Sequence, residues 1–389
     1  MTKNKSCGHI GINTQLAHGG YNPEDYFGFV NPPIVKASTV LFPDAKTLRT
    51  ENQRYTYGTH GTPTTDALCQ TVNELEGSVK TVLVPSGLAA ITVPLLGALN
   101  SGDHVLIVDS VYGPTRRFAD TMLKKLGIEV EYYDPTIGSD IEKLIKNNTK
   151  VVFTESPGSN TFEMQDIPAI ADIAHKHGAI VMMDNTWATP VYFRPLDHGV
   201  DISITAATKY PAGHADILIG FIAANERAKS IVESAHMVLG MSVSGDDAYN
   251  TLRSMRTMAV RLKHQGETAL QLAKWLETKP QISQVLHPAL SSHKGHTIWQ
   301  RDFTGSSSLF SIVLKSGGDE QAEAFLNSLK IFGLGYSWGG YESLAVQVNL
   351  SDRTIKQNYS GPVLRLQIGI EDIDDLKADL ENALKATNL

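Results

Sequence analysis

Short apolar runs alternate with amphipathic stretches through the middle of the chain. The runs cover residues 81–84, 104–109, 128–133, 150–154, 179–184, 201–205 and 217–223. Helical patterns lie between several of these runs, for example over residues 115–126 and 167–177. Strands that alternate with helices are typical of an α/β domain with a mostly parallel sheet. We therefore predict such a domain over residues 63–250.

The two ends of the chain show different patterns. Residues 1–62 hold Gly19-Gly20 and four prolines and have no sustained period, so we expect an extended arm that is ordered only where it lies on something else. A helical pattern begins near Thr65 and stops before Gly77. Residues 251–389 open with an amphipathic stretch and then alternate again, which predicts a smaller C-terminal α/β domain.

Composition narrows the class of protein. The 389 residues are 42% hydrophobic and 19% charged, as in a globular protein of two domains. The chain has 34 Lys and Arg against 41 Asp and Glu, and this acidic balance argues against nucleic acid or an anionic membrane as a partner. Cys7 and Cys69 form no disulfide or metal pattern, and no secretory signal is visible, so we expect a cytoplasmic protein.

Residues 81–100 could be interpreted either as a membrane span or as buried elements of a globular domain. Residues 81–100 carry no charge and are mostly apolar. Pro85, Gly87 and Pro94 interrupt the stretch, which favours a buried strand, a turn and a buried helix over a span.

Two polar residues at the ends of apolar strands suggest chemistry. Lys209 follows the run 202–206, and burial makes a lysine a nucleophile or an imine former; the alternative is a strand-end lysine with its ammonium in water. Asp184 closes the run 179–184, where α/β sheets bind ligands; the alternative is a helix cap or a turn. Pyridoxal phosphate needs this pair, a lysine for the Schiff base and an aspartate that keeps the pyridine nitrogen protonated.

A third feature suits a phosphate group. Ser86, Gly87 and Leu88 follow a strand and open an apolar helix, where small residues let backbone N–H groups cradle a phosphate. Thr208 adds a hydroxyl. A serine-glycine turn is weak evidence by itself, and Pro94 leaves the length of the helix open.

Two more side chains complete the set. Tyr112 follows another strand, and its ring can stack on a flat cofactor; the alternative is a packed loop tyrosine. Arg365 stands inside an apolar strand, and its planar fork suits a substrate carboxylate; the alternative is an internal partner, Glu371 or Asp372. Together the five features predict a pyridoxal-phosphate enzyme that acts on an amino acid.

The sequence also resembles the Cys/Met-metabolism family of fold-type-I pyridoxal-phosphate enzymes over nearly its whole length. The segments that carry the resemblance are 13–16, 57–58, 61–62, 74–77, 84–87, 155–159, 184–187, 207–210, 213–214, 287–288, 301–303, 336–343 and 365–366. The run 336–343, with Trp338, and Ser159 are most similar to the bacterial cystathionine β-lyases of this family. The γ-lyase and γ-synthase members usually lack that tryptophan and have asparagine in place of Ser159.

The resemblance implies the fold, which is α/β and PLP-dependent transferase-like, and a role for each matching residue. It makes Lys209 the imine lysine, Asp184 the pyridinium partner and Tyr112 the ring stacker. The phosphate ligands that it implies are Ser86, Gly87, Leu88 and Thr208. The residues that it implies for the substrate carboxylate and the pocket are Arg365, the Ser337 backbone, Trp338 and Tyr336.

The resemblance also implies an assembly. Tyr57 reaches the site of a neighbouring subunit, so the arm of residues 1–62 lies on that subunit within a homotetramer of two dimers. After Tyr57-Gly58 the family usually has an arginine that binds the cofactor phosphate across the dimer. This chain has Thr59, which offers a hydroxyl without a charge, and His60, which is charged only when protonated. Our hypothesis is weaker retention of the cofactor.

The implied reaction is cleavage of L-cystathionine to homocysteine, pyruvate and ammonia, a step of methionine biosynthesis. Lys209 moves the Cα proton, and Tyr112 or Tyr57 accepts a proton from the substrate amine. Other reactions on the same scaffold stay open: γ-elimination, γ-replacement and β-elimination from cysteine. A non-catalytic binding or regulatory protein is the alternative from another class. We expect no metal, because the histidines between residues 287 and 296 lack metal-ligand spacing, and no dinucleotide site in the glycines of residues 333–340.

Overall fold

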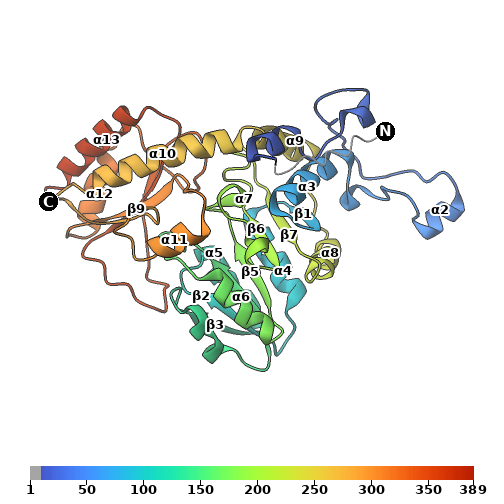
Figure 1. The fold of residues 1–389 in the computed structure, drawn as a ribbon, viewed down its shortest axis with the longest axis horizontal. Coiled ribbons are helices and arrows are strands. Elements are labelled where there is room, and N and C mark those ends of the chain that lie inside the picture. Colours follow the sequence, from blue (N-terminus) through green and yellow to red (C-terminus); the bar gives the residue numbers. More distant parts are fainter. Residues whose placement is uncertain (1–9) are drawn as a thin grey trace.

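The computed structural model describes residues 10–389, so Cys7 and the start of the chain lie outside the described residues. The chain forms two sheets with their helices, and an arm near the N-terminus that projects from the larger sheet (Figure 1). The long helix α10 (Met258–Leu276) runs between the two parts. Met258 and Leu262 at its start are buried with the larger part, whereas Leu272 and Leu276 are buried in the core of the smaller one.

The larger sheet has seven strands in the order β1-β7-β6-β5-β4-β2-β3. They are β1 (Lys80–Val84), β2 (His104–Val108), β3 (Glu129–Tyr133), β4 (Thr149–Glu155), β5 (Ile180–Asp184), β6 (Ile202–Thr205) and β7 (Gly220–Ala224). β7 is antiparallel to both of its neighbours, and all other pairs are parallel. Each of the seven predicted apolar runs overlaps one strand, and the predicted mostly parallel sheet is confirmed.

Helices cover both faces of this sheet. They are α3 (Pro63–Glu76), α4 (Gly87–Ala98), α5 (Gly113–Phe118), α6 (Ile167–Lys176), α7 (Thr189–Tyr192) and α8 (Lys229–Val238), with the π-helical η3 (Ala119–Leu123) and the 3-10 helices η4 (Gly138–Leu144) and η5 (Pro195–His198). α3 ends as predicted, at Gly77 in the left-handed conformation that glycine adopts without strain. The single helix predicted over residues 115–126 is instead α5 followed by the π-helical turn η3.

The apolar stretch 81–100 forms β1 and α4, the strand and helix that the sequence predicts. α4 continues past Pro94 to Ala98 and lies between the sheet and α8. Among the described residues no helix is both long enough and apolar enough to cross a membrane.

The smaller sheet has five strands in the order β10-β11-β12-β9-β8. They are β8 (Ile282–Leu286), β9 (Leu309–Leu314), β10 (Gly333–Leu334), β11 (Leu344–Gln347) and β12 (Val363–Gln367). The helices of this half are α10, α11 (His296–Asp302), α12 (Asp319–Ser328) and α13 (Ile373–Ala386), whereas α9 (Gly245–Met255) packs on α3 in the larger half. The sheet is antiparallel except for the β10–β11 pair. The amphipathic stretch of residues 246–276 forms two helices, α9 and α10.

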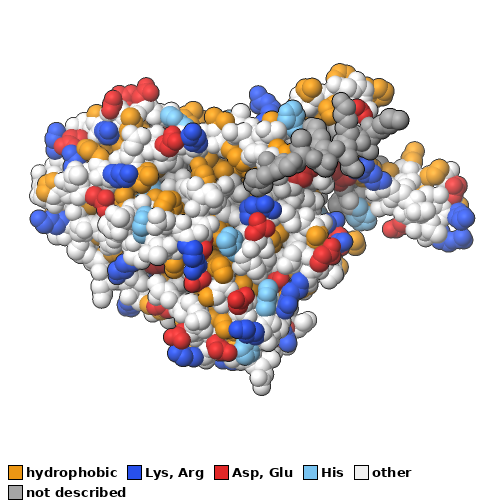
Figure 2. Space-filling model, viewed as in Figure 1, with side chains coloured by type: hydrophobic (Ala, Val, Ile, Leu, Met, Phe, Trp, Pro, Cys, Tyr) orange, Lys and Arg blue, Asp and Glu red, His pale blue; other side chains and the backbone are white. Residues whose placement is uncertain are grey.

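The arm is less extended than its sequence suggests. It contains α1 (Ile12–His18), η1 (Pro23–Tyr26), α2 (Ala45–Thr50) and η2 (Gly58–His60). The sequence pattern did not predict α1, because a helix with one buried side chain shows no apolar period. That side chain is Leu16, which packs with residues of α3. Farther along, the arm projects with hydrophobic side chains on its surface (Figure 2): Phe27 is 97% exposed and Leu41 is 85% exposed.

Candidate active site

Strand direction brings the predicted residues to one edge of the larger sheet. β5 and β6 are parallel neighbours, so Asp184, which ends β5, and Lys209, which follows β6, lie at the same edge. Tyr112 follows β2, which is parallel to these strands through β4. β1 also points this way, because β1 and β6 are both antiparallel to β7, and Ser86 follows β1. This edge is where parallel sheets bind ligands.

Lys209 is partly buried and contacts two residues of the other half of the chain. Its Nζ donates to Ser337 Oγ at 2.6 Å and lies 5.1 Å from the centre of the Trp338 ring. Burial lowers the pKa of Lys209 to about 8; the charge of Arg365 adds to this effect, and the carboxylate of Asp184 opposes it. An amine with such a pKa is a good nucleophile and proton acceptor near neutral pH.

A close backbone contact places the 336–340 loop on this lysine. Gly339 has a φ of 83°, and a Cβ there would come within 3.0 Å of the Lys209 carbonyl carbon and the Tyr210 nitrogen. Glycine is therefore required at this position. Trp338 packs against Tyr210 with ring centres 5.5 Å apart, so its ring contacts both the core and Lys209. Tyr336, the other predicted pocket residue of this loop, is 91% exposed.

Only one carboxylate oxygen of Asp184 accepts a hydrogen bond from the described residues. Its Oδ1 accepts the Thr186 N–H at 3.0 Å, whereas Oδ2 has no hydrogen-bond partner within residues 10–389. Burial raises the pKa of this carboxyl, although Thr186 and Lys209 lower it in part. A buried carboxylate with a free oxygen fits a ring N–H that carries positive charge.

The first turn of α4 offers donors for an anion. Ser86 caps the helix, and its Oγ accepts the Ala89 N–H at 3.1 Å. The N–H groups of Gly87 and Leu88 have no acceptor in the part of the chain that the structure describes. Free N–H groups at the positive end of a helix fit a phosphate.

Thr208 lies next to this helix terminus. A Cβ at Gly87 would stand 2.4 Å from Ala206 Cβ, so glycine lets α4 approach the segment that carries Thr208. Thr208 Oγ1 accepts the Ile219 N–H at 3.0 Å and donates a longer bond of 3.3 Å to the Ile219 carbonyl. The hydroxyl hydrogen can therefore turn to a phosphate without loss of the N–H bond.

Tyr112 is held by an acid that the sequence analysis did not single out. Its N–H donates to Glu155 Oε2 at 2.8 Å, and Glu155 ends β4 directly opposite Asp184 in register. Burial, together with the charge of Asp184, raises the pKa of Glu155 well above its ordinary value. Glu155 has the same sequence signal as Asp184, an acid that closes an apolar strand. The Tyr112 ring is 41% exposed, so one face is open to a ligand.

Arg365 has no carboxylate partner among the described residues. In β12, its two terminal nitrogens donate to Asn160 Oδ1 at 3.2 Å and to the Ser337 carbonyl at 3.3 Å. The possible partner Glu371 instead binds Ser343. Burial lowers the pKa of Arg365 to about 10, which leaves the guanidinium charged at neutral pH. A partly buried fork with only neutral partners among the described residues fits a substrate carboxylate. Nothing in the sequence pattern pointed to Asn160.

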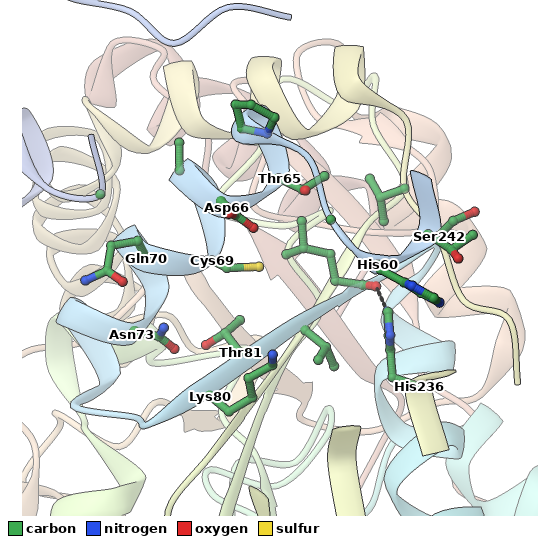
Figure 3. Close-up of a pocket in the computed structure, with 18 of the residues that line it drawn as sticks. His60, Thr65, Asp66, Cys69, Gln70, Asn73, Lys80, Thr81, His236 and Ser242 are labelled. Atoms are coloured by element: carbon green, nitrogen blue, oxygen red, sulfur yellow. Dashed lines mark hydrogen bonds between the residues drawn. The ribbon is translucent and has the colours of Figure 1, made fainter. Parts of the chain in front are cut away.

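The predicted arm residues lie elsewhere in this chain. Thr59 and His60 line a cavity of about 600 Å³ between the arm, α3, β1 and α8, whose lining does not include Lys209 (Figure 3). In this cavity His236 bonds to the Leu83 carbonyl at 2.9 Å, and His60 bonds to Thr56. Tyr57 is half exposed. One chain alone therefore does not bring the arm residues to the lysine.

Among residues 10–389, the only group of metal-ligand types within coordinating distance is His104, Glu129 and Glu131. Both carboxylates accept from Lys146 Nζ at 2.6 Å, so an ammonium ion already balances their charge. His104 and Glu129 begin β2 and β3, so this cluster lies at the opposite edge of the sheet from Lys209. It plays no part in the site.

Comparisons with known proteins agree with this geometry. The family model described as Cys/Met metabolism PLP-dependent enzyme matches residues 13–385. The chain is 61% identical to a putative cystathionine beta-lyase of Rhizobium johnstonii, with 98% of this chain and 97% of the relative covered. It is 43% identical to cystathionine beta-lyase MetC of Escherichia coli, with 95% and 97% covered.

A solved structure extends the comparison to the fold. The crystal structure of metB from Corynebacterium glutamicum superposes with a TM-score of 0.90 at 33% identity, over 97% of this chain and 98% of that one. The fold class predicted from sequence, fold type I of the pyridoxal-phosphate enzymes, is confirmed. The chain therefore belongs to the family of pyridoxal-phosphate-dependent enzymes of Cys/Met metabolism.

Proposed function

We propose that the chain is a cystathionine β-lyase, which cleaves the Cβ–S bond of L-cystathionine and, with one water, releases homocysteine, pyruvate and ammonia. The observation that carries the proposal is the pair of the partly buried Lys209 and the buried Asp184, beside Arg365, a partly buried cation that has no carboxylate partner among residues 10–389. The names of the two relatives above support this reaction over others on the same scaffold.

The residues present fit the cofactor at each end. Asp184 Oδ2 is available to the ring nitrogen, and Tyr112 offers an open ring face. The residues that we assign to the phosphate are Ser86, Gly87, Leu88 and Thr208. When bound, pyridoxal phosphate supplies an electron sink that stabilises negative charge at the substrate Cα.

Lys209 moves the protons of the reaction. Its Nζ, with a pKa lowered to about 8, accepts the Cα proton. The ammonium formed at Nζ then donates a proton to the sulfur that leaves Cβ. The hydrogen bond to Ser337 fixes the direction of Nζ, while Trp338 covers the lysine and excludes water from that side. We assign either Tyr112 or Tyr57 of a neighbouring subunit to accept the proton of the substrate amine.

Arg365 orients the substrate. Two parallel N–H bonds to the α-carboxylate fix both the position and the plane of the amino acid. Asn160 and the Ser337 carbonyl hold the guanidinium in its own plane before substrate arrives. We assign Trp338 and Tyr336 to the pocket for the rest of the substrate chain.

The arm completes the site in an assembly. We infer a homotetramer of two dimers, in which residues 1–62 of one subunit lie on its neighbour and deliver Tyr57 and Thr59 to the neighbour's cofactor. The large exposed hydrophobic side chains of the arm support this arrangement, because such groups are normally covered by a partner. Residues 63–250 then form the cofactor domain and 251–389 the C-terminal domain. A cytoplasmic location is part of the proposal, supported by Cys69, which forms no disulfide within residues 10–389.

The products of L-cystathionine test the reaction. Purified protein loaded with cofactor is incubated with L-cystathionine, and both the keto acid and the thiol are quantified. Pyruvate and homocysteine in equal amounts are expected. Release of 2-oxobutyrate with cysteine would overturn β-cleavage in favour of γ-elimination, and absence of any keto acid would contradict both reactions.

A further inference from the structure

A buried arginine joins the connection between β11 and β12 to two loops of the larger half. Arg353 Nε donates to Asp109 Oδ2, and its two terminal nitrogens donate to Thr161 Oγ1 and Glu163 Oε1, each at 3.0 Å. Arg353 is 6% exposed, and Asp109 is fully buried. Three nitrogens of one guanidinium therefore bind three different residues on two separate segments.

Asp109 is held from several directions. It accepts from Arg116 at 2.6 Å and from the N–H groups of Thr354 and Ile355 at 2.9 and 3.0 Å, in addition to Arg353. Burial alone would raise the pKa of Asp109, but these hydrogen bonds outweigh burial and hold the pKa below its ordinary value. The carboxylate is thus ionised, and the connection that carries Arg353 is fixed to the end of β2.

Both segments that Arg353 binds carry residues of the site. Asp109 stands three positions before Tyr112. Thr161 directly follows Asn160, the partner of Arg365. The two segments also touch each other, because the Ser159 N–H donates to the Ser110 carbonyl at 2.7 Å. Arg353 therefore supports the ring side and the carboxylate side of the site together.

We propose that Arg353 and Asp109 are positioning residues, which hold the Tyr112 and Asn160 segments in one arrangement so that Arg365 is aligned for the α-carboxylate of an amino acid. This inference rests on the proposed function only in that the ligand is an amino acid. A buried ion pair contributes little net stability, since desolvation offsets the attraction, whereas misplacement by about 1 Å can cost about 100-fold in rate.

Two variants test the role. Arg353→Lys keeps the charge but replaces three hydrogen-bonding nitrogens with one, so the three separate contacts are not all kept. Thr161→Val keeps the shape and removes the hydroxyl next to Asn160, which accepts from Arg353 and donates to Glu163. Glycine, which has the carboxylate but no leaving group, is titrated into the cofactor-loaded protein, and the visible absorption of the cofactor reports its affinity. We expect weaker glycine binding in both variants, up to about 100-fold in Arg353→Lys, with a raised KM for L-cystathionine and a smaller change in kcat.

Asp379→Asn is the matched control. Asp379 is a buried carboxylate on α13 that accepts the N–H groups of residues 330–332 at 2.8–3.1 Å, away from the site. This variant is expected to lower the melting temperature and leave glycine affinity unchanged.

Wild-type glycine affinity and KM in both test variants, with only a lowered melting temperature, would overturn the positioning role. If Arg353→Lys does not fold, Thr161→Val decides by the same readout. Wild-type protein that binds glycine but releases no keto acid from L-cystathionine would overturn the proposed reaction and leave this test intact.

Discussion

The two sheets contribute to the site in different ways. In the larger sheet, Asp184 and Lys209 come at or just after the carboxyl ends of parallel strands, where the chain leaves the sheet. The smaller sheet is mainly antiparallel and has no such common edge, and its charged residue, Arg365, stands inside a strand. The larger sheet thus gathers side chains from many strands at one place, whereas the smaller one presents a single cation on a rigid face.

The ionisable residues that the two sheets contribute also differ in their pKa values. Burial lowers the pKa of Lys209 and raises the pKa of Asp184. Such shifts are typical of side chains that bind or transfer protons during a reaction. Burial also lowers the pKa of Arg365, but only to about 10, so this side chain keeps its charge. The comparison teaches that the larger sheet supplies the proton chemistry and the smaller sheet supplies recognition.

The largest effect is expected from Lys209→Ala. Without Nζ no side chain accepts the Cα proton, and pyruvate release should fall by about 10⁴-fold or more. Lys279→Ala is the control, because that lysine binds Glu381 in the smaller half and should leave pyruvate release unchanged. Near-normal activity of Lys209→Ala would remove the central residue of the mechanism.

Asp184→Asn should lower kcat by about 100-fold or more, with little change in KM, because a neutral amide does not hold a proton on the ring nitrogen. Glu155→Gln is its counterpart on the neighbouring strand. Since the pKa of Glu155 is already raised well above its ordinary value, the neutral amide should change kcat only a few-fold. Steady-state kinetics separate the two, and equal losses would show that the carboxylate charge is not the decisive feature.

Arg365→Lys tests the recognition side. Lysine keeps the charge but loses the two-pronged contact, so KM should rise about 10- to 100-fold while kcat changes less. Initial rates over a range of L-cystathionine concentrations give both constants. A fall in kcat at unchanged KM would place Arg365 with the chemistry and break the comparison.

Thr59→Arg probes the arm, which is outside both sheets. Arginine at this position adds a positive charge for the phosphate of a neighbouring subunit, so the cofactor should leave more slowly on dialysis, by several-fold. Residual cofactor absorbance over time is the measurement. If the rate of loss is unchanged, the missing arginine does not limit cofactor retention.

Glu76→Gln is expected to change stability and to leave the activity unaffected. Burial raises the pKa of Glu76 to about 7, although Ser203 on β6 donates to its Oε1. The unfolded chain loses this proton near pH 4.5, so the free energy of unfolding falls as pH rises from about 4.5 to 7 and then levels off. The glutamine variant should flatten this slope and be more stable at pH 8, by at most about 3 kcal/mol. Melting temperatures at pH 5 and pH 8 provide the check; the same pH dependence in both proteins would show that Glu76 ionises normally.

The sequence predicted those site residues that differ in kind from their immediate neighbours in the chain. Lys209, Asp184 and Tyr112 follow apolar runs, and Arg365 interrupts one, so each stands out against its neighbours. Asn160 does not stand out, because its role depends on the approach of β12 from more than 200 residues away. The same limit applies to the antiparallel order of the smaller sheet, which depends on pairing and not on apolar pattern.

The most direct test of the division between the sheets is exchange of the Cα proton of L-alanine in D₂O, followed by NMR. L-Alanine has the carboxylate and the Cα proton but no sulfur to release. At saturating alanine we predict exchange near the wild-type rate in Arg365→Lys and slow exchange at every concentration in Asp184→Asn. The account would be contradicted if, at saturating alanine, exchange of the Cα proton were slow in Arg365→Lys and near the wild-type rate in Asp184→Asn.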